Sequence, residues 1–90
     1  MNKHLNITII GKVQGVWYRA YTQKKAIELN INGFVYNQPD GSVYAELEGP
    51  EEALQAMLTW CKKGPPLANV KEILIAEGEW QHLESFNIQR

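Results

Sequence analysis

Apolar and polar residues alternate along several stretches of the chain, and this period of two predicts β-strands. The clearest alternation covers residues 5–10, where every second side chain is apolar. Residues 33–37 are rich in β-branched and aromatic side chains, and residues 42–48 alternate again. Asp40 and Gly41 lie between these last two stretches and suit the positive φ angles of a tight turn. We therefore expect the second and third strands to form a hairpin.

Two other segments have the spacing of amphipathic helices. The first runs from about Tyr18 to Leu29, and Asn30 is expected to end it because asparagine tolerates a left-handed backbone. The second follows Pro50, which fits a first helical position, and Gly64 ends it after a basic last turn. Apolar residues recur in it at i, i+3, i+4 and i+7 and form one face of the helix: Leu54, Met57, Leu58 and Cys61.

Residues 70–76 and 86–88 complete the pattern as two further strands. The order β-α-β-β-α-β, with an added C-terminal strand, predicts an α+β, ferredoxin-like domain over residues 1–90. We expect an antiparallel sheet with both helices on one face. Connection rules place the third strand between the first and second, which then run parallel. The loop after the first strand and Asn37, at the end of the second, are therefore expected to open onto one crevice.

The segment between Gly11 and Arg19 joins a strand to a helix and could bind an anion. Such a loop points several unpaired N–H groups in one direction, and the helix dipole adds positive potential. Gly15 would let the backbone curl closely around an anion, and Arg19 can donate two parallel hydrogen bonds to phosphate or carboxylate oxygens. From these residues alone, a simple glycine turn with a surface arginine stays open as the alternative.

Two spaced motifs resemble the signatures of the acylphosphatase family. Gly11-x-Val13-Gln14-Gly15-Val16-x-Tyr18-Arg19 resembles the first, and Gly33-Phe34-Val35-Tyr36-Asn37-x-x-x-Gly41-x-Val43 resembles the second. The segment Lys63–Ala68 and the Phe86-x-Ile88 strand are similar to the corresponding parts of the family. The resemblance extends from about Leu5 to Ile88 and implies a ferredoxin-like fold, in agreement with the order of elements.

The resemblance also implies an activity, the hydrolysis of acyl phosphates to a carboxylate and inorganic phosphate. In the family, the arginine of the first motif and its loop amides bind the phosphoryl group, and the asparagine of the second orients the attacking water. By this resemblance, the two roles fall to Arg19 and Asn37 in this sequence. No metal or cofactor is implied, since the leaving carboxylate is already stable. The phosphate-binding set implied by the resemblance is Gln14, Gly15, Val16, Trp17, Tyr18 and Arg19.

Several positions depart from common family patterns. Tyr18 stands where phenylalanine is frequent, and Tyr21 and Asn30 are also unusual. Trp17 replaces a smaller residue and Tyr36 replaces a polar or basic one. We expect these two to affect substrate preference and rate rather than the reaction class.

Other chemically active side chains are assigned structural roles. His4 and His82 lie near opposite ends of the chain and have no partners at the spacing of metal ligands. Cys61 lies on the apolar face of the second helix, so packing is expected there rather than nucleophilic catalysis. Glu46 and Glu48 alternate with the apolar residues of the third strand and are expected to form a solvated face.

Composition limits the partners and the cellular setting. The net charge of −1 gives no basic footprint for nucleic acid, and no apolar run is long enough to cross a bilayer. The N-terminal residues have no long apolar core of a signal peptide. With a single cysteine, no internal disulfide forms. We expect a cytoplasmic monomer with a small-molecule acyl phosphate as substrate, and with no nucleic-acid or membrane partner.

Two alternative functions remain open at this point. RNA recognition motifs share the same order of elements, but they present aromatic side chains on their central strands and usually a basic surface. The first strand here carries no aromatic residue. The other alternative is a non-catalytic, regulatory acylphosphatase-like module, as in hydrogenase maturation factors.

Overall fold

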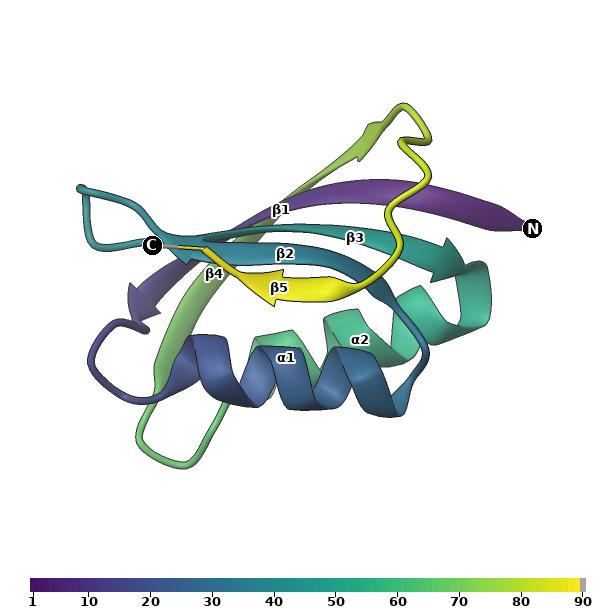
Figure 1. Ribbon diagram of the computed structural model, residues 1–90. Helices are drawn as coiled ribbons and strands as arrows, with labels where there is room; N and C mark the ends of the chain where they lie inside the picture. The colour runs from purple at the N-terminus through teal and green to yellow at the C-terminus, as the bar shows by residue number, and fades with distance from the viewer. Residues whose placement is uncertain (90) are drawn as a thin grey trace.

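The computed structural model describes residues 1–89 of the chain. Five strands and two helices follow one another in the expected order. Figure 1 shows one twisted sheet with both helices packed against the same face. The bounds are β1 (Asn2–Lys12), α1 (Tyr18–Glu28), β2 (Asn32–Asn37), β3 (Val43–Pro50), α2 (Glu51–Lys63), β4 (Asn69–Gly78) and β5 (Phe86–Ile88).

The sheet has the strand order β4-β1-β3-β2-β5. As predicted, β3 lies between β1 and β2 and pairs antiparallel with both, so β1 and β2 run parallel without touching. β4 pairs antiparallel with the other side of β1. The sheet is not purely antiparallel as expected, because β5 runs parallel to β2. β5 forms the edge of the sheet opposite β4. The ends of β1, β2 and β5 therefore point toward the same end of the molecule.

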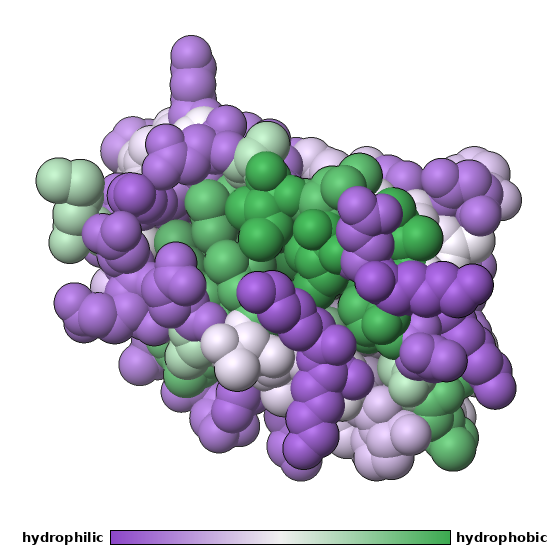
Figure 2. All heavy atoms as spheres, turned by 180° about the vertical axis from the view of Figure 1, so that it is seen from behind, coloured by the Kyte–Doolittle hydropathy of each residue, from purple (hydrophilic) through white to green (hydrophobic). Residues whose placement is uncertain are grey.

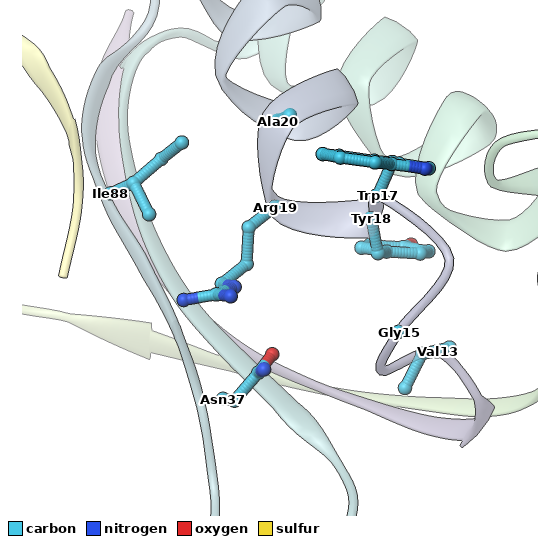
Figure 3. A pocket seen from close by; sticks show the side chains of 8 residues that line it. All are labelled: Val13, Gly15, Trp17, Tyr18, Arg19, Ala20, Asn37 and Ile88. Atoms are coloured by element: carbon cyan, nitrogen blue, oxygen red, sulfur yellow. The ribbon is translucent and has the colours of Figure 1, made fainter. Parts of the chain in front are cut away.

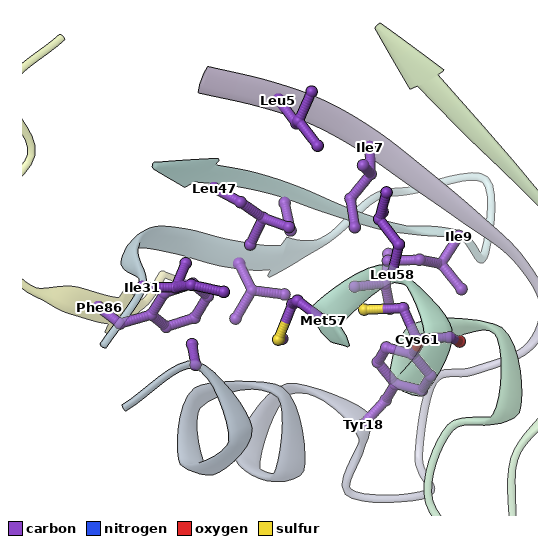
Figure 4. Packing of buried hydrophobic residues seen from close by; sticks show 14 of the residues in the cluster. Leu5, Ile7, Ile9, Tyr18, Ile31, Leu47, Met57, Leu58, Cys61 and Phe86 are labelled. Carbon is purple, nitrogen blue, oxygen red and sulfur yellow. The ribbon is translucent and has the colours of Figure 1, made fainter. Parts of the chain in front are cut away.

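The core lies between the sheet and the two helices (Figure 4). Alternate residues of the three inner strands project into it, and the expected helix faces meet them. Tyr18, Thr22 and Ala26 of α1 are buried, and α2 contributes all four residues of its predicted stripe. Cys61 is fully buried and free, as its packing role requires. Burial raises the pKa of the Cys61 thiol to about 12, so it stays protonated at neutral pH.

The predicted turns are confirmed, with one difference at the start of α2. Asn30 has a φ of 59° and Gly41 a φ of 95°. Pro50 is not the first helical residue, because its ψ of 145° is extended and it still pairs with Asn2 at the end of β3. Glu51 is therefore the first residue of α2. Within the described chain, neither helix has the length and apolar character needed to cross a membrane.

One prediction about the sheet surface is wrong. Glu48 is not solvated: only 1% of it is exposed, although Glu46 beside it remains partly accessible. The segment between β4 and β5 folds over the end of this face and needs acceptors for its backbone N–H groups. The carboxylate of Glu48 accepts hydrogen bonds from the backbone N–H groups of Gln81 and Leu83, the latter at 2.7 Å.

The edge of the sheet formed by β4 leaves apolar side chains accessible. Figure 2 shows an apolar patch surrounded by hydrophilic side chains on the rear of the molecule. A groove of about 420 Å³ lies between β1, β4 and α2, with Leu5, Leu58 and Ile75 among its lining residues. None of its lining residues belongs to the loop between β1 and α1.

Candidate active site

The loop between β1 and α1 is fixed from both sides by apolar side chains. Val13 and Val16 are almost completely buried, so they anchor the loop in the core. Between them, Gly15 has a φ of 74°, and a Cβ there would meet no atom within 4 Å. The glycine is therefore required by backbone conformation and not by space, since positive φ is unfavourable for other residues. Gly15 therefore lets the loop turn sharply between its two buried anchors.

Gln14 ties this loop to the β2–β3 hairpin. Its side-chain N–H groups donate to the carbonyl oxygens of Gln38 at 2.7 Å and Ser42 at 2.9 Å. The amide of Gln14 is therefore engaged within the protein, and any phosphate contact would have to come from its backbone. Because Gln38 follows Asn37 directly, this link sets the distance between the loop and the end of β2.

Tyr18 anchors the first turn of α1. Its ring is 1% exposed and packs against Trp60 with ring centroids 5.7 Å apart. Its hydroxyl donates to the carbonyl oxygen of Cys61 at 2.6 Å, near the end of α2. This bond gives the hydroxyl a buried partner, and burial raises the pKa of Tyr18 far above its ordinary value. Like Gln14, Tyr18 can contribute only its backbone N–H to an anion.

Arg19 and Asn37 meet at one cavity. It has a volume of about 370 Å³ and lies between the loop, the first turn of α1 and the ends of β2 and β5. Figure 3 shows both side chains pointing into the same space from opposite walls. Of the residues implied by the family resemblance, Gln14 and Val16 do not line the cavity. The described lining consists of Val13, Gly15, Trp17, Tyr18, Arg19, Ala20, Asn37 and Ile88.

The cavity is electrostatically suited to an anion. Arg19 is the only charged side chain among these eight lining residues. Its Nη1 lies 3.5 Å from the carbonyl oxygen of Gln89, just beyond β5. Gln89 in turn donates its backbone N–H to Val35 of β2 at 2.8 Å. The C-terminal segment thus lies beside the guanidinium and next to β2.

Sequence reasoning missed the contribution of Ile88 and Gln89. The short C-terminal strand was predicted, but its parallel place beside β2 was not, and only this place brings its end to the cavity. Conversely, Tyr36 does not reach the cavity. It lies on the free face of the sheet, where its ring packs against Phe34 and Tyr44. Of the two unusual residues expected to affect substrate preference, only Trp17 lines the cavity.

No metal-binding cluster is evident in the part of the chain that the structure describes. Within residues 1–89, no three His, Cys, Asp or Glu side chains gather in a way that could hold a metal ion. His82 is exposed, and its Nδ1 accepts a hydrogen bond from the indole of Trp80 at 3.1 Å. His4 is buried in a hydrogen-bond network with Glu46 and Glu48, so its structural role is confirmed.

Comparisons with known proteins match the chain over nearly its whole length. A protein from Thermus thermophilus named acylphosphatase is 47% identical over 78 residues, covering 87% of this chain and 89% of the relative. One from Thiobacillus denitrificans is 44% identical over 80 residues, covering 89% and 90% of the two chains. The crystal structure of acylphosphatase from Bacillus subtilis superimposes with a TM-score of 0.95 at 34% identity and covers both chains completely.

A larger protein also contains this fold. Full-length HypF, in a crystal structure of its phosphate- and nucleotide-bound form, matches with a TM-score of 0.93 and 33% identity. The match covers all of this chain but only 12% of HypF, so the chain corresponds to one part of that protein. The sequence model of the acylphosphatase family matches residues 5–88, which include both motifs and all eight residues that line the cavity. The chain therefore belongs to the acylphosphatase family of hydrolases.

Proposed function

We propose that this protein hydrolyses the carboxyl–phosphate bond of small acyl phosphates in the cavity between Arg19 and Asn37. Family membership and the named relatives support this activity. One structural observation carries the assignment to this site. Arg19 and Asn37, which are distant in sequence, line the same cavity. The loop between β1 and α1, in which Gly15 has a positive φ, forms part of its wall.

Binding of the phosphoryl group is assigned to Arg19 and the loop. The guanidinium would donate two hydrogen bonds to non-bridging oxygens, and backbone N–H groups of residues 15–19 would donate to the same group. These donors are held in place before substrate arrives, because Val16 and Tyr18 are buried. Preorganised donors stabilise the charge that develops in the transition state more effectively than mobile water does.

Attack is assigned to a water molecule that Asn37 holds in line with the departing carboxylate. The water oxygen forms the new bond to phosphorus, and the bond between phosphorus and the carboxylate oxygen breaks. The leaving carboxylate keeps the electron pair, and the water proton passes to a phosphoryl oxygen of the substrate. Fixing the water converts a diffusive encounter into a near-attack geometry. No protein acid is needed, because a carboxylate is a stable leaving group.

The proposal includes the setting in which the protein acts. One domain over residues 1–90, working as a cytoplasmic monomer, is compatible with the buried, unpaired Cys61. We propose no nucleic-acid partner, although Phe34, Tyr36 and Tyr44 do place aromatic rings on the free face of the sheet. The hydroxyl of Tyr44 donates to Glu46 at 2.8 Å, and this carboxylate would repel a phosphate backbone.

The anion-binding half of the proposal is tested by substituting Arg19. Arg19→Ala should raise the KM for acetyl phosphate, weaken competitive inhibition by inorganic phosphate and lower kcat. Arg19→Lys should restore these values only partly, because an ammonium group cannot reproduce the two-pronged guanidinium. Circular dichroism should show an unchanged fold, since Arg19 is not part of the core. If folded Arg19→Ala binds phosphate as tightly as the wild type, the anion site lies elsewhere.

A further inference from the structure

Trp17 combines an unfavourable backbone conformation with an exposed side chain. Its φ of 65° and ψ of 21° lie in the left-handed region, where glycine is the favoured residue. The indole is 73% exposed and takes no part in the hydrophobic core. It also supplies no side-chain cap to α1. A large apolar residue kept in such a place contributes little to folding, and strained residues of this kind cluster at ligand sites.

The position of the indole relates it to the catalytic cavity. Trp17 and Ala20 line the cavity that contains Arg19 and Asn37 (Figure 3). The same two residues line a second, more open hollow of about 360 Å³. The two spaces therefore adjoin each other at Trp17 and Ala20.

Two further residues of α1 complete the second hollow. Tyr21 follows Trp17 by one helical turn, with its backbone N–H donating to the carbonyl oxygen of Trp17 at 3.1 Å. Its ring is 43% exposed, and Lys24 lies one turn further along the same helix face. The second hollow thus offers two aromatic side chains and then an exposed ammonium group.

From this arrangement we propose that Trp17, Tyr21 and Lys24 form the subsite for the acyl group of the substrate. This inference rests on the proposed function, which places the phosphoryl group at Arg19. Because Trp17 and Ala20 line both spaces, an acyl group that extends from the phosphoryl group past the indole reaches the second hollow. The subsite favours acyl phosphates with a planar, apolar acyl group, which packs on the indole, and with an anionic end that Lys24 attracts.

The experiment compares three substrates: acetyl phosphate, benzoyl phosphate and 4-carboxybenzoyl phosphate. The ratio of kcat/KM between two substrates isolates the effect of the acyl group, because both substrates make the same phosphoryl contacts. Trp17→Ala should lower the benzoyl-to-acetyl ratio about five-fold, mainly through KM, whereas Trp17→Phe should keep most of it. Lys24→Gln should lower the ratio of 4-carboxybenzoyl to benzoyl phosphate about three-fold. The matched control is Ile27→Ala, which removes another exposed apolar side chain of α1 and should change neither ratio.

The outcomes separate the subsite from the reaction. If the wild type hydrolyses none of the three compounds, the proposed function fails and the subsite fails with it. If acetyl phosphate is hydrolysed but Trp17→Ala lowers kcat/KM equally for all substrates, Trp17 serves the loop and the subsite proposal is overturned. Trp17→Gly gives a second check on folding, because glycine removes the backbone strain. The benzoyl-to-acetyl ratio should fall in this variant too, and a normal ratio in a folded Trp17→Gly protein would refute the subsite.

Discussion

The buried network around His4 allows one prediction to be worked out in detail. His4 is 2% exposed and lies between two carboxylates: its Nδ1 is 2.7 Å from Glu48 and its Nε2 is 2.7 Å from Glu46. Both ring nitrogens can donate to these carboxylates only when the ring is protonated. Glu48 also accepts the two backbone N–H groups of the segment that leads to β5. His4→Ala therefore removes the cation that compensates a buried carboxylate and loosens residues 79–85, the segment that leads to β5.

The expected magnitude follows from the contacts that remain. Removing one partner of a buried ion pair typically costs about 3–5 kcal/mol. Glu48 keeps its backbone donors from Gln81 and Leu83, so we expect the lower end, about 3 kcal/mol of the free energy of unfolding. For a domain of this size, such a loss lowers Tm by about 12–24 °C. His82→Gln is the matched control, because His82 is exposed and its replacement should cost less than about 0.5 kcal/mol.

The pH dependence of stability gives a more specific signature. Burial lowers the pKa of His4, but hydrogen bonds to Glu48 and Glu46 and their negative charges outweigh it, so this pKa lies above its usual value. The contribution of His4 to the free energy of unfolding is therefore complete below about pH 6.5, and it is lost as the pH rises through the raised pKa of His4. Burial raises the pKa of Glu48, but its backbone and His4 hydrogen bonds lower it overall. The contribution of Glu48 to the free energy of unfolding is present above about pH 4.3, and it is lost as the pH falls through the lowered pKa of Glu48.

Urea unfolding of wild type, His4→Ala and His82→Gln between pH 5 and pH 9 tests this account. Within this range, the difference in the free energy of unfolding between wild type and His4→Ala should be largest from pH 5 to about pH 6.5 and should shrink in alkaline solution. His82→Gln, at an exposed position, is measured alongside as the control for replacing a histidine. A cost for His4→Ala below about 1 kcal/mol, or one that stays constant across this range, would refute a buried imidazolium between two carboxylates.

Three further predictions concern the reaction and its supporting contacts. Hydrolysis of acetyl phosphate should persist in EDTA, because residues 1–89 contain no cluster suited to a metal ion; loss of activity that a divalent ion restores would count against the mechanism. Acetyl phosphate should be hydrolysed far faster than glycerol phosphate, because no acid is assigned to protonate an alkoxide, and comparable rates would reveal a missed catalytic acid. Gln14→Leu should cost about 1–2 kcal/mol of stability in urea, because the carbonyl groups of Gln38 and Ser42 each lose a donor; an unchanged midpoint would show that this link is dispensable.

The fold could be predicted because local signals and connection rules agree. The stripe from Leu54 to Cys61 fixed the buried face of α2, and the alternation in residues 5–10 and 42–48 assigned the strands. The relation between parallel strands then brought the loop after β1 near Asn37 without any knowledge of contacts. The place of β5 could not be predicted, because three residues carry too weak a pattern to choose an edge or a direction.

The errors have a common physical origin in long-range contacts. Alternation put Glu48 on the face away from the helices, and that assignment was right. It could not show that the segment 79–85 would fold over this face and supply donors. His4 is the direct cross-strand partner of Glu48, so the pair becomes visible only once the register of β1 and β3 is known. The resemblance assigned phosphate binding to the loop amides, and the structure adds that the side chains of Gln14 and Tyr18 bond within the protein.

The central claim is that Asn37 positions the attacking water in a cavity whose anion-binding wall does not depend on it. The most direct measurement is the kcat of Asn37→Ala on acetyl phosphate together with the inhibition constant of inorganic phosphate, with circular dichroism as the control for folding. We predict a fall in kcat of about 100-fold or more, with phosphate binding nearly unchanged. A folded Asn37→Ala enzyme with near-normal kcat, or one that no longer binds phosphate, would contradict this division of roles between Asn37 and Arg19.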